Sequence, residues 1–143
     1  MTATDTSTRP DVELVLPARP ESVAVVRHVL AGVGDALGMD ERAVADLRLA
    51  VSEACTNVVV HAYVDEGEDD DGQVMEIEAA ARGTLLHVTV RDHGRGMEPP
   101  ATEPGLGLGL PIVDKVASSM ELRSGPAGNE VSMTFVLPGG AGA

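Results

Sequence analysis

Five glycines follow a single aspartate between residues 92 and 109, and few folds can accommodate such a stretch. Residues 84–92, TLLHVTVRD, alternate apolar and polar side chains as a half-buried strand does, and Asp92 closes that strand. Glycine weakens local order unless the backbone must take a conformation, or approach a ligand, that a side chain would forbid. The stretch therefore predicts either an unusual backbone conformation or a close approach to a ligand at the end of this strand.

The rest of the chain predicts an α+β two-layer sandwich with a largely antiparallel sheet. Runs of neighbouring strands beside runs of helices, rather than strict alternation of strand and helix, favour this class. Ser22 is the expected cap of the first helix, and Gly38 is expected to end it. The expected order is a strand over 12–16, helices over 21–37 and 39–63, a hairpin of strands 74–81 and 84–92 turning at Arg82-Gly83, a helix over 109–119, and two final strands within 120–138.

The length of 143 residues suits one domain, expected over residues 11–138. Residues 1–10 are expected to form a disordered lead and residues 139–143 a flexible tail. The chain has one tyrosine, one phenylalanine and no tryptophan, so its core must be aliphatic.

The composition excludes several classes of partner. A net charge of −13 argues against nucleic acid and against anionic membranes, which both attract basic proteins. Much of the excess lies in the run DEGEDDDG at 65–72, which is expected to be a solvated loop. Cys55 is the only cysteine, and neither a signal peptide nor a long apolar span is evident, so a cytoplasmic protein is expected.

The second helix carries a polar stripe. Glu53, Asn57 and His61 recur every fourth residue and fall within about 80° of one another on a helix. One interpretation is a plain amphipathic helix with this face in water. Small flanking residues, and the lack of Lys or Arg within four residues after Glu53, favour a working site instead. Asn57 can offer a neutral oxygen to Mg²⁺, and Glu53 can polarise a hydroxyl or a water. The opposite, buried face is expected to hold Leu47, Val51, Ala54, Cys55, Val58 and Ala62.

The glycines exclude two nucleotide-binding schemes and favour a third. No GK[ST] sequence is present for a P-loop, and the G-x-G-x-G at 105–109 follows Pro104 instead of the strand that a dinucleotide fingerprint needs. In the remaining scheme the carboxylate of Asp92 accepts a hydrogen bond from the exocyclic amine of adenine. GLGLGL then offers backbone N–H groups to phosphates just before a helix. A flexible surface loop is the alternative, but linker glycines usually accompany serine rather than alternate with leucine.

SEACTN, RDHGRG and GLGLGL, in that order, resemble the ATP-binding domain shared by histidine kinases, Hsp90-type chaperones and type II topoisomerases. The chain looks most like the bacterial anti-sigma factor serine kinases, over residues 12–137. The resemblance implies the Bergerat-type fold, a mixed, mostly antiparallel sheet of four or five strands with helices on one face, and ATP bound under a short lid. The chain is shorter than the chaperones and topoisomerases, and no hairpin with a phosphoacceptor histidine precedes the domain.

The resemblance also implies roles for individual residues. Glu53 matches the catalytic base, Asn57 the Mg²⁺ ligand, and Arg27 an arginine that contacts a partner. His61 is expected to serve local packing. The matched nucleotide-binding positions are Asn57, Asp92, Gly94, Gly96, Gly105, Leu106, Gly107, Leu108, Gly109 and Asn129.

Two departures from the family pattern bear on activity. Only eight residues, MEPPATEP, separate Gly96 from Gly105, so the lid is short, and three prolines stiffen it. Asn129, in GNEV, stands where the family usually has threonine near the adenine. Both departures predict weakened nucleotide binding.

The resemblance implies phosphoryl transfer from Mg²⁺-ATP to a serine of an anti-anti-sigma (STAS-type) partner, together with binding of a sigma factor. Relatives of this kind often dimerise, so a homodimer is among the expected assemblies. The main alternative is a nucleotide-sensing interaction module of the same fold with little transfer activity. A purely structural interaction domain without a ligand is a third.

Overall fold

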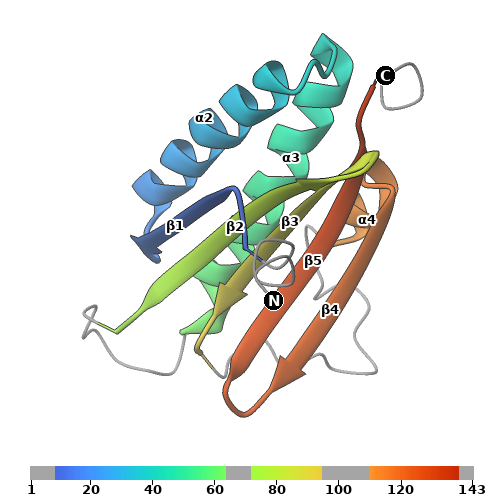
Figure 1. Cartoon of the computed structure of the whole chain (residues 1–143). Helices are drawn as coiled ribbons and strands as arrows, with labels where there is room; N and C mark the ends of the chain where they lie inside the picture. The colour runs from blue at the N-terminus through green and yellow to red at the C-terminus, as the bar shows by residue number, and fades with distance from the viewer. Residues whose placement is uncertain (1–8, 64–71, 95–109, 139–143) are drawn as a thin grey trace.

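Three helices cover one face of a five-stranded sheet in the computed structural model, which describes residues 9–63, 72–94 and 110–138 (Figure 1). The expected tails at 1–8 and 139–143, and all of residues 95–109, lie outside the described residues. None of the described helices has the length and apolar character that crossing a membrane requires. The elements are β1 (Val12–Pro17), α2 (Pro20–Ala36), α3 (Glu41–Asn57), the π-helical turn η1 (Val58–Ala62), β2 (Val74–Arg82), β3 (Leu85–Asp92), α4 (Leu110–Val116), β4 (Ser119–Gly125) and β5 (Gly128–Val136).

The strand order is β1-β2-β3-β5-β4, and every neighbouring pair is antiparallel. This confirms the largely antiparallel two-layer sandwich, but the expectation of a mixed sheet was wrong. After β3 the chain crosses through α4 to the edge strand β4, which runs in the direction of β3. Strand β5 then inserts between the two and separates them, so no parallel pair forms.

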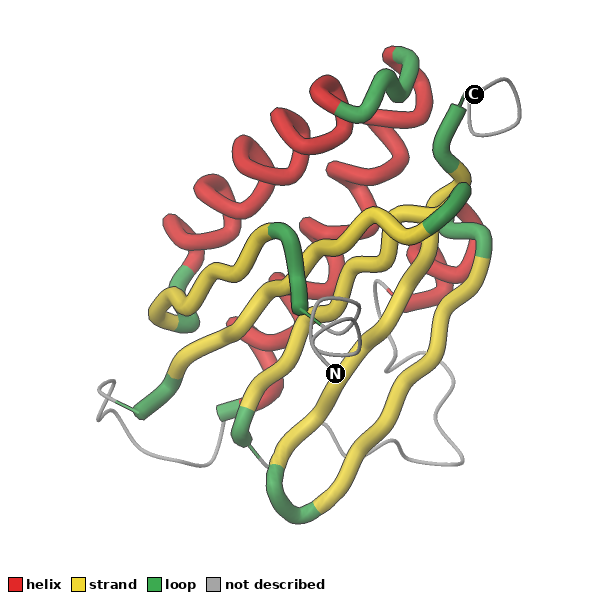
Figure 2. The backbone as a smooth tube through the Cα atoms, viewed as in Figure 1, coloured by secondary structure: helices red, strands yellow, loops and turns green. Residues whose placement is uncertain are grey.

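The helices lie against one face of the sheet (Figure 2). The core is mostly aliphatic, as the composition predicted, and also contains Tyr63 and Phe135. Along β3, Leu86, Val88 and Val90 are buried against the helices, as the alternating pattern predicted. The outer face of the sheet is polar. There Arg91 forms ion pairs with Glu76, Glu78 and Glu130 at 3.3, 3.5 and 3.1 Å. The largest fully buried side chains include Leu30, Leu47, Met75, Ile77, Leu86 and Met133.

The helix starts show why local signals only partly predict boundaries. Asp40 caps α3 by accepting a hydrogen bond from the backbone N–H of Ala43 at 2.8 Å. The expectation that Ser22 caps α2 was wrong, because the fixed φ of Pro20 suits the first helical position and starts the helix earlier. Ser22 is instead buried within the first turn. Gly38 follows α2 with a φ of 84°, which ends the helix as expected.

Leu47 and Leu49 provide a matched test of this packing. Leu47→Ala is expected to lower the free energy of unfolding by about 2–5 kcal/mol, because the side chain is fully buried. Leu49→Ala, on the same helix but 40% exposed, should change it by only about 0.5 kcal/mol. Urea denaturation of the two variants measures the difference. Equal losses would contradict the assignment of the buried face.

Candidate functional site

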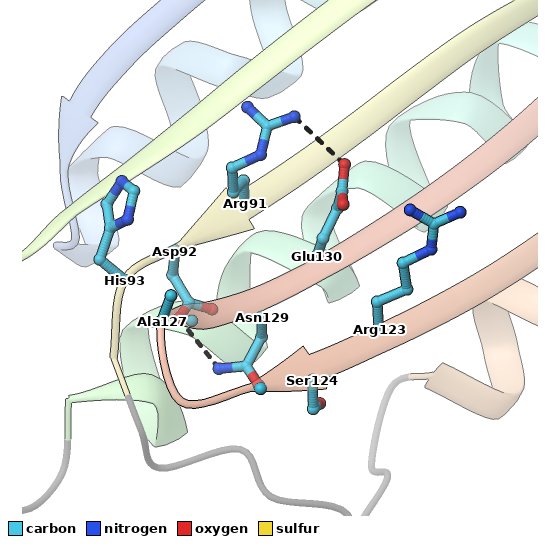
Figure 3. A pocket seen from close by; sticks show the side chains of 10 residues that line it. Arg91, Asp92, His93, Arg123, Ser124, Ala127, Asn129 and Glu130 are labelled. Carbon is cyan, nitrogen blue, oxygen red and sulfur yellow. Dashed lines mark hydrogen bonds and ion pairs between the residues drawn. The ribbon is translucent and has the colours of Figure 1, made fainter.

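Asp92 is a carboxylate buried at the end of a strand. It is the last residue of β3, it faces the helices, and it is only 1% exposed. In the sheet it lies opposite Met75 of β2 and Asn129 of β5. The side chain of Asn129 donates a hydrogen bond from Nδ2 to Oδ1 of Asp92 at 2.9 Å (Figure 3). The backbone N–H of Gly94 donates to the same oxygen at 2.9 Å. Both of these bonds end on Oδ1, and a backbone hydrogen bond from Asn129 also stabilises the carboxylate.

Burial and hydrogen bonding act in opposite directions on this carboxyl. Burial raises the pKa of Asp92 above its ordinary value, because the charged form loses water. The bonds from Asn129 and Gly94 oppose this rise, because they stabilise the carboxylate. The net effect is a raised pKa, so the ionised group is incompletely compensated in the protein alone.

Two glycines allow the backbone to pack closely around Asp92. A methyl group at Gly94 would overlap the carbonyl oxygen of Ala62, at the end of η1. Gly128 has a φ of 141°, and a methyl group there would overlap the carbonyl oxygen of Asp92. At Gly94 the close approach is made by the protein's own backbone at Ala62. Gly128 was not among the predicted site residues, although its position directly before Asn129 was a usable signal.

Tyr63 is a further residue that the sequence analysis missed. Its hydroxyl donates to the carbonyl of Val74 at 2.6 Å and accepts from the backbone N–H of His93 at 3.0 Å. The side chain is buried, at 8% exposure. As one of only two aromatic residues, and the one that ends the longest helical pattern, it could have been singled out.

The polar stripe on α3 lies at the margin of the buried face. Asn57 is 5% exposed, while Glu53 and His61 are partly buried. The expected buried face is confirmed, since its six residues are all at most 2% exposed. The interpretation as a plain water-facing stripe was therefore wrong for Asn57. The π-helical turn η1 begins directly after Asn57, and such turns are frequent at functional sites.

The predicted site residues are brought together in two groups. Asp92 and Asn129 line a cavity of about 390 Å³ with His93 and Arg123, and Gly94 follows directly. Glu53 and Asn57 do not line this cavity. They lie on the helix whose last turn, at Ala62, contacts Gly94. The remaining predicted positions, Gly96, Gly105, Leu106, Gly107, Leu108 and Gly109, lie outside the described residues.

Arg27 is exposed on α2 and lies away from the Asp92 cavity. It lines a separate surface cavity of about 300 Å³ with Ala45, Arg48, Leu49 and Ser52 of α3. Of the described residues that line it, none is acidic.

The donor set of α3 suits a metal that is shared with a ligand. Among the described residues, no group of three or more His, Cys, Asp or Glu side chains could hold a metal ion. Mg²⁺ usually takes only one or two protein oxygens and keeps waters and substrate phosphates as its other ligands. The buried carboxamide of Asn57 fits that demand.

Asp92→Asn is expected to raise the free energy of unfolding at about pH 7, because it removes a buried charge. The folded-state pKa of Asp92 is raised, so the cost of the ionised group is complete above that pKa. The cost disappears as the pH falls toward 3.8, the ordinary value. Urea denaturation of both proteins at several pH values checks this. The advantage of the variant should shrink on acidification, and a constant difference would contradict the burial argument.

The chain is similar in sequence and in fold to several known proteins. The serine-protein kinase RsbW of Bacillus velezensis is 32% identical, with 90% of this chain and 86% of the relative covered. The same kinase of Bacillus subtilis gives the same identity and coverage. Two solved structures share the fold. The RsbU and RsbW domains of a Mycobacterium tuberculosis protein have a TM-score of 0.69 at 23% identity, covering 90% of this chain and 33% of that one. The Pseudomonas aeruginosa SiaB–SiaC complex has a TM-score of 0.66 at 14% identity, covering 96% of each chain.

The family assignment covers most of the chain. A sequence profile described as the histidine kinase-like ATPase domain matches residues 16–135, which include the end of β1, all elements from α2 to β4, and β5 except its last residue. The buried aspartate, its glycines and the asparagine on α3 all fall within that match. The chain therefore belongs to the family of histidine kinase-like ATPase domains.

Proposed function

We propose that the protein is a Mg²⁺- and ATP-dependent serine kinase that phosphorylates an anti-anti-sigma protein of the STAS type and binds a sigma factor. The single observation that carries this proposal is the buried carboxylate of Asp92 at the end of β3, whose Oδ1 accepts hydrogen bonds from Asn129 and Gly94. Relatives named serine-protein kinase, similar over most of their length, support transfer to serine. Residues 11–138 form the working domain in this proposal, and the cytoplasm is its compartment.

Asp92 would recognise the base. Its Oδ2 accepts the exocyclic amine of adenine and would repel the oxygen that guanine carries at the same place. A buried polar group strengthens such discrimination, because the wrong ligand leaves it unpaired. Asn129 replaces the family's usual threonine, and its Nδ2 already donates to Asp92. Its own carbonyl oxygen remains a second acceptor beside the base.

Asn57 and Glu53 would serve the phosphates. When bound, Mg²⁺ neutralises charge on the phosphate oxygens and holds them in place. Asn57 supplies one neutral oxygen to it from a nearly buried position. Glu53, one helical turn earlier, accepts the proton of the attacking serine hydroxyl and orients that hydroxyl. The backbone amides of residues 105–109 are the expected phosphate donors.

The cavity between α2 and α3 would receive the protein partner. Arg27 and Arg48 place two cations beside the exposed apolar side chain of Leu49, in a chain whose net charge is −13. A partner segment with carboxylates and an apolar side chain fits this combination. Sigma-factor binding is assigned to this surface.

Phosphate transfer tests the kinase. Wild-type protein, labelled ATP and the cognate anti-anti-sigma protein should give labelled partner. Glu53→Ala should lower the transfer rate by about 10²–10⁴-fold with little change in ADP affinity, because a base acts in the transition state.

Asp92→Asn should abolish ADP binding, measured by titration calorimetry, although it leaves the protein folded. Asn57→Ala should remove the dependence of binding on Mg²⁺.

A second candidate function is a nucleotide-sensing module, and the same variants distinguish it from the kinase. The short, proline-bearing lid and the engaged Nδ2 of Asn129 both suit a nucleotide-sensing module that transfers little phosphate. In that case Glu53→Ala keeps full control of the sigma factor while Asp92→Asn destroys it. No labelled partner at all, with nucleotide binding intact, would decide for the module.

The double variant Arg27→Ala/Arg48→Ala tests the partner surface. It should weaken sigma-factor binding by at least about tenfold, because two rim cations are lost, and the loss should be larger at low salt. ADP affinity should not change. Arg42→Ala is the matched control, since Arg42 is exposed on α3 and does not line the cavity. Equal effects of both variants on binding would remove this surface from the proposal.

A further inference from the structure

Three separate segments of the chain meet at one hydroxyl group, that of Tyr63. The residue directly follows η1, its partner Val74 begins β2, and its other partner His93 directly follows β3. We infer that Tyr63 is a positioning residue that fixes the strand end carrying Asp92 relative to the helix carrying Asn57. The inference rests on the proposed nucleotide site, because it concerns how the two halves of that site are held together.

The Tyr63 hydroxyl takes the place of a backbone hydrogen bond between β2 and the residue that follows β3. The β2–β3 ladder runs with a constant register, and its last pair at this end is Met75 with Asp92. Val74 and His93 are the next pair in that register. Their backbone groups do not hydrogen-bond to each other, as they would if the ladder continued. Instead the Tyr63 hydroxyl lies between them, donating to the carbonyl of Val74 at 2.6 Å and accepting the N–H of His93 at 3.0 Å.

This insertion ties the strand exit to the helix. A ladder that continued to His93 would hold residues 93 and 94 to β2. With the hydroxyl in between, the backbone N–H of His93 is bonded to a side chain at the end of the helix, while the imidazole of His93 stays bonded to Glu76 of β2 at 3.0 Å. Gly94 then packs on the carbonyl of Ala62 and beside the ring of Tyr63, where a larger residue would not fit.

The tie acts directly on Asp92. His93 lies between Asp92 and Gly94, and the N–H of Gly94 donates to Oδ1 of Asp92 at 2.9 Å. Moving His93 therefore moves a donor that orients the carboxylate. Tyr63 is also six residues after Asn57, from which it is separated only by the π-helical turn η1. A nucleotide whose base lies on Asp92 and whose metal lies on Asn57 spans both ends of this connection, and small misplacement of such groups is costly.

Tyr63→Phe tests the inference, because it keeps the ring and removes only the hydroxyl. Backbone hydrogen exchange at His93 should become about tenfold faster, since its N–H loses its acceptor. ADP affinity should be measured by calorimetry with Mg²⁺ and with EDTA. In the presence of Mg²⁺ the affinity should fall by about tenfold, and in EDTA by clearly less, because only the metal complex engages both Asp92 and Asn57. The gain in affinity from Mg²⁺ should thus shrink in the variant.

Two controls separate positioning from general stability. Ser119→Ala removes another side-chain hydrogen bond, of 2.7 Å to Thr134, at the opposite end of the sheet. Val26→Ala lowers stability from α2, where the side chain is fully buried. Both should leave ADP affinity and its dependence on Mg²⁺ unchanged at a temperature where all variants are folded.

The outcomes distinguish a failure of the Tyr63 inference from a failure of the proposed function. Wild-type protein that binds no ADP overturns the proposed function, and the inference with it. Wild-type binding together with unchanged affinities in Tyr63→Phe overturns the inference alone. An equal loss with Mg²⁺ and with EDTA also overturns it, because Tyr63 would then serve only the base pocket.

Discussion

Keeping a carboxylate buried at the end of β3 is the constraint from which the local architecture follows. An ionised group loses hydration on burial and must be compensated by donors at short range. Asn129 and Gly94 supply two such donors to Asp92. Their approach requires the backbone to turn tightly after the strand and β5 to start close beside it. Glycines at 94 and 128 make both possible, because a side chain at either position would overlap a carbonyl oxygen.

The compensation is incomplete, and that property suits a binding site. If donors satisfied Asp92 fully, a ligand would gain little by adding one more. Burial raises the pKa of Asp92, so the ionised carboxylate is less favourable at this position than in water. A ligand that donates to Oδ2 removes part of this cost, and binding only the folded state also stabilises the protein. Stability is thus reduced locally where affinity is needed.

The parts that could be predicted from sequence were those set by short-range pattern. Alternation along residues 84–92 fixed which side chains of β3 are buried, and four-residue spacing placed Asn57 on the helix flank. Long-range pairings left no such trace. The bond between Asn129 and Asp92 joins residues 37 apart, and the insertion of β5 between β3 and β4 is a choice of topology. The hydrogen bonds of the Tyr63 hydroxyl left no such pattern either, because they join backbone groups of Val74 and His93, whose identity the sequence does not encode.

Arg91 and Asp92 are adjacent residues of β3 that carry opposite charges on opposite faces of the sheet. Arg91 is the neighbour of Asp92, but successive residues of a strand point to opposite faces. On the outer face Arg91 is held by Glu76, Glu78 and Glu130, and hydrogen bonds to two of these carboxylates help to raise its pKa. A cation on the inner face would pair with Asp92 and occupy the oxygen that a ligand needs. The acidic cluster therefore holds the guanidinium group of Arg91, which lines the same cavity as Asp92, in ion pairs with glutamates. The side-chain oxygen Oδ1 of Asp92 accepts its hydrogen bonds from the neutral donors Asn129 and Gly94.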